Sequence, residues 1–316
     1  MNNPSTPRAL PFRLTSPFSI GLISPSGFVR DASDLQSAIR HLTADGHTVR
    51  PGRNAGGSWQ YFSGTDTDRL SDIRQAATDP GLQVIMATRG GYGISRLMDR
   101  IPWEQMALGG KSWVGFSDFT LIHLGLLAKT GMVSFAGPMA AVDLKSDLSS
   151  HEGWHFLSRL LTEPVVSMPP VSTPHPYSGQ TIEGTIWGGC LSLLAAATGT
   201  PWMPEVEDGI LFIEDVNEEP YRIERLLFQL YHAGILSRQK ALLFGEFNQC
   251  LPGPGSAWPY TLDHVINHFR NLLPYPVLTG FPFGHVAGKL AVPIGGHARL
   301  TIGKNGYKIR FSEYNK

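Results

Sequence analysis

The amino-acid sequence predicts an α/β protein in which a Rossmann- or flavodoxin-like parallel sheet precedes a C-terminal domain of mixed α/β or β-rich structure. Three observations support this prediction. Short apolar runs alternate with segments of helical periodicity up to residue 136, as in parallel sheets covered by helices. Prolines then interrupt the pattern between residues 164 and 176. Apolar runs resume after residue 181, and 316 residues suffice for two domains that each bury a core.

The elements of the first half follow from these patterns. In residues 31–45, for example, Leu35, Ile39 and Leu42 recur at helical spacing, and Gly46 follows as a C-terminal cap. Further helices are predicted over residues 65–78, 92–101 and 120–127. The predicted strands cover residues 19–27 (with a terminal turn), 47–51, 82–87, 113–116 and 132–136.

The sequence also predicts how the chain divides into domains and which elements its second half contains. We predict an N-terminal domain at residues 1–145, a linker region at 146–180 and a C-terminal domain at 181–316. Residues 222–232 form the clearest amphipathic helix, because Ile223 and Leu227 share an apolar face with other leucines. The remaining predicted elements are helices over residues 151–161 and 261–273 and β structure over residues 209–215, 241–247, 291–294 and 298–302.

Composition excludes several classes of protein. The formal net charge is zero and no basic stripe is present, which argues against nucleic-acid binding. Cys190 and Cys250, the two cysteines, lie outside any C-x-x-C motif, so we expect neither a zinc site nor a disulfide framework. No apolar run approaches the roughly 20 residues that cross a bilayer. We therefore expect a soluble cytoplasmic protein.

The stretch Trp113-Val114-Gly115-Phe116-Ser117-Asp118 leads from a predicted strand into a predicted helix. At such a corner a serine hydroxyl faces solvent at the carboxyl end of the sheet, and the backbone N–H of Asp118 lies at a helix N-terminus, where negative charge is favoured. Ser117 is therefore a candidate nucleophile. The alternative is a simple helix N-cap, because the second glycine of G-x-S-x-G is absent.

The loop Arg89-Gly90-Gly91-Tyr92-Gly93 follows the third predicted strand, so it should emerge at the same edge of the sheet as Ser117. One of its N–H groups is placed to join that of Asp118 in an oxyanion hole. The alternative is a tight strand-to-helix turn without ligand, because neither dinucleotide nor P-loop spacing is matched.

A serine nucleophile needs a base, and the base needs an orienting carboxylate. His285 is the candidate base, because it follows a strand and a Gly284 turn, whereas most other histidines fall within predicted helices. Glu214 and Asp215 end a very apolar run and point to opposite faces, so only one can serve the site. The order Ser117, Glu214, His285 is also the order of the α/β-hydrolase triad.

Several stretches together resemble the LD-carboxypeptidases (muramoyltetrapeptide carboxypeptidases), serine peptidases of murein recycling. The resemblance implies that Ser117 is the nucleophile, His285 the general base and Glu214 its orienter, with oxyanion donors from Asp118 and from Gly90 or Gly91. It further implies release of D-alanine from murein tetrapeptide without metal, in the cytoplasm, by a homodimer. The stretches are residues 89–93, 115–120, 135–139, 184–189, 211–218 and 283–285.

Three questions stay open at this point. Arg89 is a candidate reader of the terminal D-alanine carboxylate, or else forms a structural ion pair. Trp187 is a candidate aromatic clamp, as a self-immunity peptidase acting on a toxic peptidyl-nucleotide would need, or else a core residue. Cys190 stands where many relatives carry asparagine, and nothing basic near it in sequence would make it a nucleophile. A non-catalytic muropeptide-binding protein is the remaining alternative.

Overall fold

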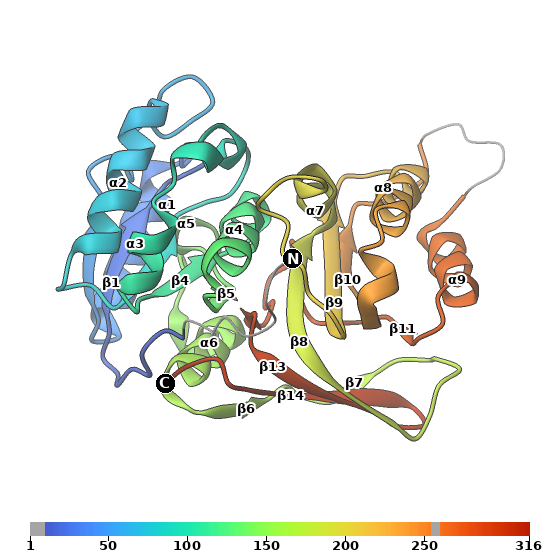
Figure 1. The fold of residues 1–316 in the computed structure, drawn as a ribbon. Coiled ribbons are helices and arrows are strands. Elements are labelled where there is room, and N and C mark those ends of the chain that lie inside the picture. Colours follow the sequence, from blue (N-terminus) through green and yellow to red (C-terminus); the bar gives the residue numbers. More distant parts are fainter. Residues whose placement is uncertain (1–9, 254–259) are drawn as a thin grey trace.

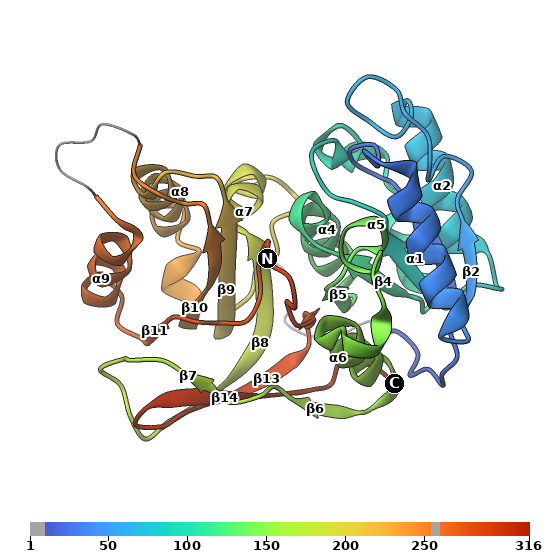
Figure 2. The ribbon, with the colours of Figure 1, turned by 180° about the vertical axis from the view of Figure 1, so that it is seen from behind.

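The computed structural model describes residues 10–253 and 260–316, and it confirms the α/β fold class. Two sheets stand side by side, as Figures 1 and 2 show from opposite sides. The first sheet is ordered β12-β5-β4-β3-β1-β2, and all of its strands are parallel except β12. Its first five strands are β1 (Ser19–Ile23), β2 (Thr48–Pro51), β3 (Val84–Ala87), β4 (Ser112–Gly115) and β5 (Ser134–Ala136).

Helices cover both faces of this sheet. α2 and α3 lie in front in Figure 1, with α4 beside them, whereas α1 lies in front in Figure 2 and packs on α5. β3, β4 and β5 between them are fully buried, which explains their largely apolar sequences. The helices are α1 (Ala32–Ala44), α2 (Asp66–Thr78), α3 (Trp103–Leu108), α4 (Thr120–Thr130) and α5 (Ala140–Asp143).

The second sheet is ordered β11-β10-β9-β8-β13-β14-β6, with β7 paired to β14. Strands β8 to β11 are parallel, and the rest form an antiparallel arm that runs beneath them in Figures 1 and 2. The strands are β6 (Val165–Ser167), β7 (Val171–Ser172), β8 (Gln180–Cys190), β9 (Gly209–Val216), β10 (Gln239–Asn248), β11 (Val277–Leu278), β13 (His297–Ile302) and β14 (Gly306–Ser312). The remaining helices are α6 (Glu152–Thr162), whose Trp154 contacts Phe18 and His47 of the first half, and α7 (Leu191–Ala197), α8 (Pro220–His232) and α9 (Leu262–Leu272).

Three details differ from the sequence predictions. Residues 92–101 form two short 3₁₀ turns, Ile94–Arg96 and Met98–Arg100, and not one helix. The first sheet is not wholly parallel, because β12 (Val292–Ile294) from the far end of the chain joins it antiparallel to β5. Pro293 fits there because β12 is an edge strand. Residues 146–180, predicted as a linker region with a helix over 151–161, contain the two short strands β6 and β7 beside α6, and the proposed domain boundaries stay a prediction.

Contacts between the two halves bring the carboxyl ends of both parallel sheets together. The backbone N–H of Cys190, at the end of β8, donates to Thr120 Oγ1 at 3.2 Å. The turn after β12 bonds to β8, since Gly295 N–H donates to the Ile186 carbonyl at 2.8 Å and Ile186 N–H donates to Gly296 at 2.9 Å. Helices α4 and α7 pack against each other across this joint, as Figure 1 shows. Within the described residues, no helix is long and apolar enough to cross a membrane.

Close packing around α4 can be tested at Gly125. A Cβ atom there would lie 2.3 Å from Cη2 of the buried Trp103, so Gly125→Ala forces the ring or the helix to move. Overpacking of this kind costs about 1–3 kcal/mol, which outweighs the gain of up to about 1 kcal/mol from helix propensity. We expect a lower urea midpoint for this variant. Gly56→Ala is the control, because its nearest neighbour is 3.7 Å away, and equal stability of both variants would contradict the packing argument.

Candidate active site

Ser117, His285 and Glu214 lie in one hydrogen-bonded line, although they are far apart in sequence. His285 Nε2 is 3.0 Å from Ser117 Oγ, and His285 Nδ1 is 2.7 Å from Glu214 Oε2. The serine comes from the first sheet, and the other two residues come from elements of the second. Both imidazole nitrogens are thus engaged, one by a hydroxyl and one by a carboxylate. This is the geometry in which an imidazole can take a hydroxyl proton while the carboxylate stabilises the resulting cation.

The local backbone presents Ser117 at a sharp turn. β4 ends at Gly115, and the 3₁₀ turn Ser117–Phe119 leads directly into α4. Ser117 has φ of 61°, a conformation that is strained for a residue with a Cβ and that recurs at nucleophile elbows. Its side chain forms no cap to the turn and contacts His285 instead. The interpretation of Ser117 as a simple N-cap is therefore not supported.

Glu214 orients the imidazole from a buried position at the end of β9. Its side chain is fully buried, and burial raises the pKa of Glu214, while the hydrogen bond from His285 opposes that rise. Oε1 has no hydrogen-bond partner among the described residues. The carboxylate of Glu214 therefore binds His285 through Oε2 alone. Asp215 points elsewhere and accepts from the N–H and hydroxyl of Ser192, each at 2.8 Å. The predicted opposite orientation of the two carboxylates is confirmed.

The loop that carries His285 is attached to β10. Glu246 N–H donates to the Phe283 carbonyl at 2.8 Å, and the Asn248 side-chain amide donates to the His285 carbonyl at 3.1 Å. The Phe116 ring contacts the imidazole edge to face at 5.1 Å between centroids. These contacts limit rotation of the ring, and its side chain remains 20% exposed, so a substrate can reach it.

Gly90 approaches the nucleophile closely. A Cβ atom on Gly90 would lie 2.9 Å from Ser117 Oγ and 3.5 Å from the backbone nitrogen of Asp118, so only glycine fits. In the described part of the chain, the N–H groups of Gly90 and Gly91 donate to no protein acceptor. Gly90 therefore packs against both Ser117 and the backbone nitrogen of Asp118, which is where the predicted oxyanion hole needs the loop to be. Which glycine donates stays a prediction.

Arg89 and Cys190 lie at the margins of this arrangement. Arg89 Nη1 donates to the Phe28 carbonyl at 2.8 Å, and among the described residues Arg89 forms no ion pair. Its Nη2 lies 3.6 Å from the position that a Cβ of Gly91 would take. Cys190 is buried, and desolvation with the nearby charges of Glu214 and Asp215 raises the pKa of its thiol, which keeps it protonated. Cys190 is thus unsuited to be a nucleophile.

Trp187 does not reach this site. Its side chain is fully buried within β8, and its indole N–H donates to Gln239 Oε1 at 2.8 Å. A ring enclosed in the core cannot stack on a ligand, so the interpretation of Trp187 as a clamp is wrong and the core interpretation holds. The two following glycines do not expose the ring, because Gly188 lies directly against the Phe212 carbonyl of β9.

A cavity of about 690 Å³ opens beside His285. Its wall includes Phe116 and the buried ion pair of Lys289 with Asp143, and Lys289 Nζ lies 4.3 Å above the Phe116 ring. Lys145 and Glu152 line the outer part, so both signs of charge surround the space. The cavity therefore suits a ligand that carries both amino and carboxylate groups. The described residues contain no group of three His, Cys, Asp or Glu that could hold a metal ion.

Sequence reasoning missed the Asp118 side chain, since only its backbone was considered. The carboxyl is 1% exposed, and it accepts from the Ser26 hydroxyl at 2.7 Å and from Ile94 N–H at 3.0 Å. Burial raises the pKa of Asp118 from 3.8 to about 6, although both hydrogen bonds and Arg69 oppose that rise. An acidic residue directly after a candidate nucleophile was the available signal, but sequence does not reveal its burial.

The raised pKa of Asp118 predicts a pH-dependent effect on stability. The native state binds this proton more tightly than the unfolded chain, so the stabilisation is complete below pH 3.8 and is lost as the pH rises through about 6. Asp118→Asn removes this titration. The free energy of unfolding of the variant, relative to wild type, should rise by up to about 3 kcal/mol between pH 4 and pH 7 in urea unfolding. A difference that stays constant with pH would contradict this assignment.

Comparisons with known proteins agree with this geometry. Residues 20–137 match the LD-carboxypeptidase N-terminal domain, and residues 183–300 match the LD-carboxypeptidase C-terminal domain. A putative carboxypeptidase of Streptomyces coelicolor is 34% identical over 304 residues, which are 92% of each chain. The microcin C7 self-immunity protein MccF of Escherichia coli is 25% identical over 307 residues, which are 87% of each chain.

A solved structure is similar along nearly the whole chain. The crystal structure of muramoyltetrapeptide carboxypeptidase from Oxalobacter formigenes has a TM-score of 0.87 and 38% identity, and the match covers 94% of this chain and all of that one. The two matched domains together cover more than half of the sequence. The chain therefore belongs to the LD-carboxypeptidase family and is a serine-type carboxypeptidase.

Proposed function

We propose that the protein hydrolyses the L,D-peptide bond that releases terminal D-alanine from murein tetrapeptide. The observation that carries this proposal is the continuous line of hydrogen bonds from Glu214 through His285 to Ser117. The similarity to the Oxalobacter formigenes muramoyltetrapeptide carboxypeptidase supports the choice of substrate. The role in cytoplasmic murein recycling and the assembly as a homodimer belong to this proposal and rest on the family resemblance.

Catalysis would proceed by acyl transfer in two steps. His285 Nε2 takes the hydroxyl proton as Ser117 Oγ attacks the carbonyl carbon that precedes D-alanine. When the tetrahedral intermediate collapses, the C–N bond breaks and Nε2–H gives its proton to the leaving amine. Water, deprotonated by the same nitrogen, then hydrolyses the ester on Ser117. Glu214 keeps Nδ1 protonated throughout and stabilises the imidazolium.

The backbone N–H groups of Asp118 and Gly90 would hold the oxyanion during both steps. Gly90 packs against Ser117 and the Asp118 nitrogen, and the positive end of the α4 dipole adds to the field at this point. A donor of this kind contributes about 10²–10³-fold to kcat in serine hydrolases. No metal or cofactor takes part in this proposed mechanism.

Recognition of a free carboxylate would fall to Arg89. One of its nitrogens is held by the Phe28 carbonyl, so the guanidinium is fixed, and the other terminal nitrogen lies beside Gly91 in the proposed oxyanion loop. The mixed-charge cavity beside His285 would accommodate the remaining amino and carboxylate groups of the tetrapeptide. A planar guanidinium suits bidentate contact with a carboxylate.

The two alternatives are less well supported. A peptidase acting on a peptidyl-nucleotide, as the similarity to MccF suggests, would use an aromatic clamp, but Trp187 is enclosed in the core. A binding protein without activity has no need of an imidazole aligned with both a hydroxyl and a buried carboxylate. Parallel assays with an acyl-sulfamoyl adenylate and with murein tetrapeptide would separate the two enzymes.

Removal of the nucleophile tests the serine mechanism. Ser117→Ala should lower kcat for D-alanine release by about 10⁴-fold or more, because neither acylation nor deacylation can occur without the hydroxyl. Mass spectrometry of a defined L,D-tetrapeptide, which loses one alanine, is the measurement, and its D,D counterpart is the control substrate. Turnover that persists in this variant would exclude Ser117 as the nucleophile. Binding without turnover by the wild type would favour the binding-protein alternative.

The role of Arg89 is tested with paired substrates. Charge-assisted hydrogen bonds contribute about 1.5–3 kcal/mol, so the wild type should prefer a tetrapeptide with a free carboxylate over its C-terminal amide by about 10–100-fold in kcat/KM. Arg89→Ala should remove this preference. The amide substrate controls for any loss of loop structure, because such a loss slows both reactions alike. A preference that survives in the variant would show that another group reads the carboxylate.

A further inference from the structure

Two buried charged side chains lie behind the loop of residues 89–94, which we call the oxyanion loop. The carboxyl of Asp118 binds the loop at Ile94 N–H, at 3.0 Å, and binds Ser26 Oγ at 2.7 Å, both through Oδ2. Oδ1 is buried and has no partner among the described residues. The side chain that follows the nucleophile thus holds the loop through a single oxygen.

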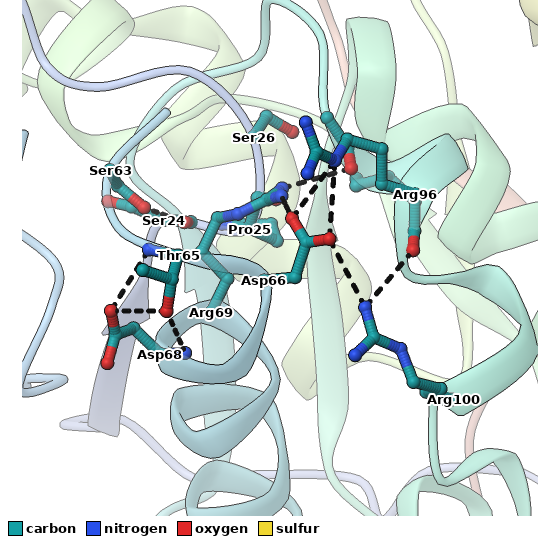
Figure 3. Close-up of polar contacts among 12 residues, drawn as sticks. Ser24, Pro25, Ser26, Ser63, Thr65, Asp66, Asp68, Arg69, Arg96 and Arg100 are labelled. Carbon is teal, nitrogen blue, oxygen red and sulfur yellow. Dashed lines mark hydrogen bonds and ion pairs between the residues drawn. The ribbon is translucent and has the colours of Figure 1, made fainter. Parts of the chain in front are cut away.

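Arg69 binds the same loop from the other direction. Its side chain is fully buried, and Nη1 donates to the Gly93 carbonyl at 3.0 Å and to the Pro25 carbonyl at 2.5 Å. Nη2 forms an ion pair with Asp66 at 2.6 Å, as Figure 3 shows. The guanidinium also packs on the Phe62 ring, 4.5 Å from its centroid.

Together these contacts join two loops of the first half of the chain. Asp118 and Arg69 each bind one residue of the oxyanion loop and one residue of the segment 24–28 that follows β1. A direct backbone bond from Gly27 N–H to the Gly90 carbonyl, at 3.2 Å, closes the arrangement. Because Gly90 touches Ser117, any shift of the loop would move an oxyanion donor relative to the nucleophile.

We propose that Asp118 and Arg69 are positioning residues, which fix the oxyanion loop at the distance from Ser117 that transition-state stabilisation requires. The inference rests on the proposed serine mechanism and extends it beyond the three residues in line and their backbone donors. Both charged groups end on backbone atoms of the loop, Arg69 on Gly93 O and Asp118 on Ile94 N–H, within four residues of Gly90.

The cost of burying these charges supports a role beyond stability. A buried ionised group destabilises the fold unless it is fully paired, and well-packed apolar residues often serve stability equally well. Here neither group is fully satisfied, since Asp118 Oδ1 and Arg69 Nε have no partner among the described residues. Misplacement of reacting groups by about 1 Å can lower the rate about 10²-fold. Accurate placement of the loop can therefore outweigh the stability lost by burying these charges.

The test compares variants that remove or keep the bonds to the loop. Asp118→Ala and Arg69→Met remove them, whereas Asp118→Asn keeps an oxygen acceptor for Ile94 N–H and Ser26. Ser26→Ala is a milder probe that removes one bond to Asp118. Arg100→Ala is the matched control, because Arg100 binds Asp66 in the exposed part of the same cluster (Figure 3) but does not touch the loop.

Two readouts are used on proteins whose folding is verified by circular dichroism. The first is kcat and KM for tetrapeptide hydrolysis. The second is the rate at which a fluorophosphonate labels Ser117, followed by mass spectrometry. Labelling also develops negative charge on an oxygen in the oxyanion hole, and it does not depend on which peptide is the substrate. If the wild type is labelled but does not hydrolyse tetrapeptide, the proposed substrate is wrong. The labelling rates of the variants then still test the roles of Asp118 and Arg69.

We expect Asp118→Ala to lower kcat and the labelling rate by about 10²-fold, with KM within about twofold of wild type. Arg69→Met should behave in the same way, whereas Asp118→Asn and Arg100→Ala should stay within about threefold of wild type. Ser26→Ala should lie between these groups. Folded Asp118→Ala or Arg69→Met protein with rates within threefold of wild type would overturn the inference. Equal losses in Asp118→Asn and Asp118→Ala, or an effect on KM alone, would overturn it as well.

Discussion

The hydrogen bond between His285 Nε2 and Ser117 Oγ, 3.0 Å long, is the interaction on which the rest of the structure depends. It is the point at which two separately built sheets must meet with sub-ångström accuracy. The serine is presented by the turn after β4, whereas the imidazole is supplied by a loop attached to β10. Contacts across the joint, such as that of Cys190 with Thr120 and the pairing of β12 with β5, hold together the two sheets that supply these atoms.

Electrostatics at the site follows from burial on both sides of that bond. Glu214 is enclosed with a single engaged oxygen, so its interaction with His285 is directional and weakly screened. His285 itself remains partly open to the mixed-charge cavity. On the serine side, Asp118 and Arg69 are buried beneath the oxyanion loop, where water cannot weaken their contacts with backbone groups. The reacting centre is thus a rigid, polar arrangement that opens on one side to a cavity.

Much of the fold and of the candidate site could be predicted from the sequence, because the patterns that indicate them lie within short stretches of the chain. Apolar runs bounded by turns located the parallel strands, and the helical spacing of leucines located α1 and α8. The corner position of Ser117 followed from the junction of a predicted strand with a predicted helix, and the opposite orientations of Glu214 and Asp215 followed from strand alternation. Trp187 was ambiguous because a tryptophan beside glycines fits either a core or a binding surface, and only burial decides between them.

The remaining features depend on contacts between distant segments. The pairing of β12 with β5 joins residues that are more than 150 positions apart, and no local pattern encodes it. Residues 146–180 contain short strands that are stable only because β14 pairs with them. The roles of Asp118 and Arg69 arise from burial and from partners contributed by two loops, the segment 24–28 and the oxyanion loop. Sequence periodicity reports none of these.

The central claim is that Ser117 is a nucleophile, that His285 from the other half of the molecule is its base, and that N–H groups of Asp118 and the oxyanion loop bind the oxyanion. A crystal structure of the protein trapped with a phosphonate analogue of the tetrapeptide tests this claim most directly. The account predicts a covalent bond from phosphorus to Ser117 Oγ, with one phosphonate oxygen between the N–H groups of Asp118 and the oxyanion loop and His285 still bound to Glu214. An adduct on another residue, or a phosphonate oxygen that faces away from those N–H groups, would contradict it.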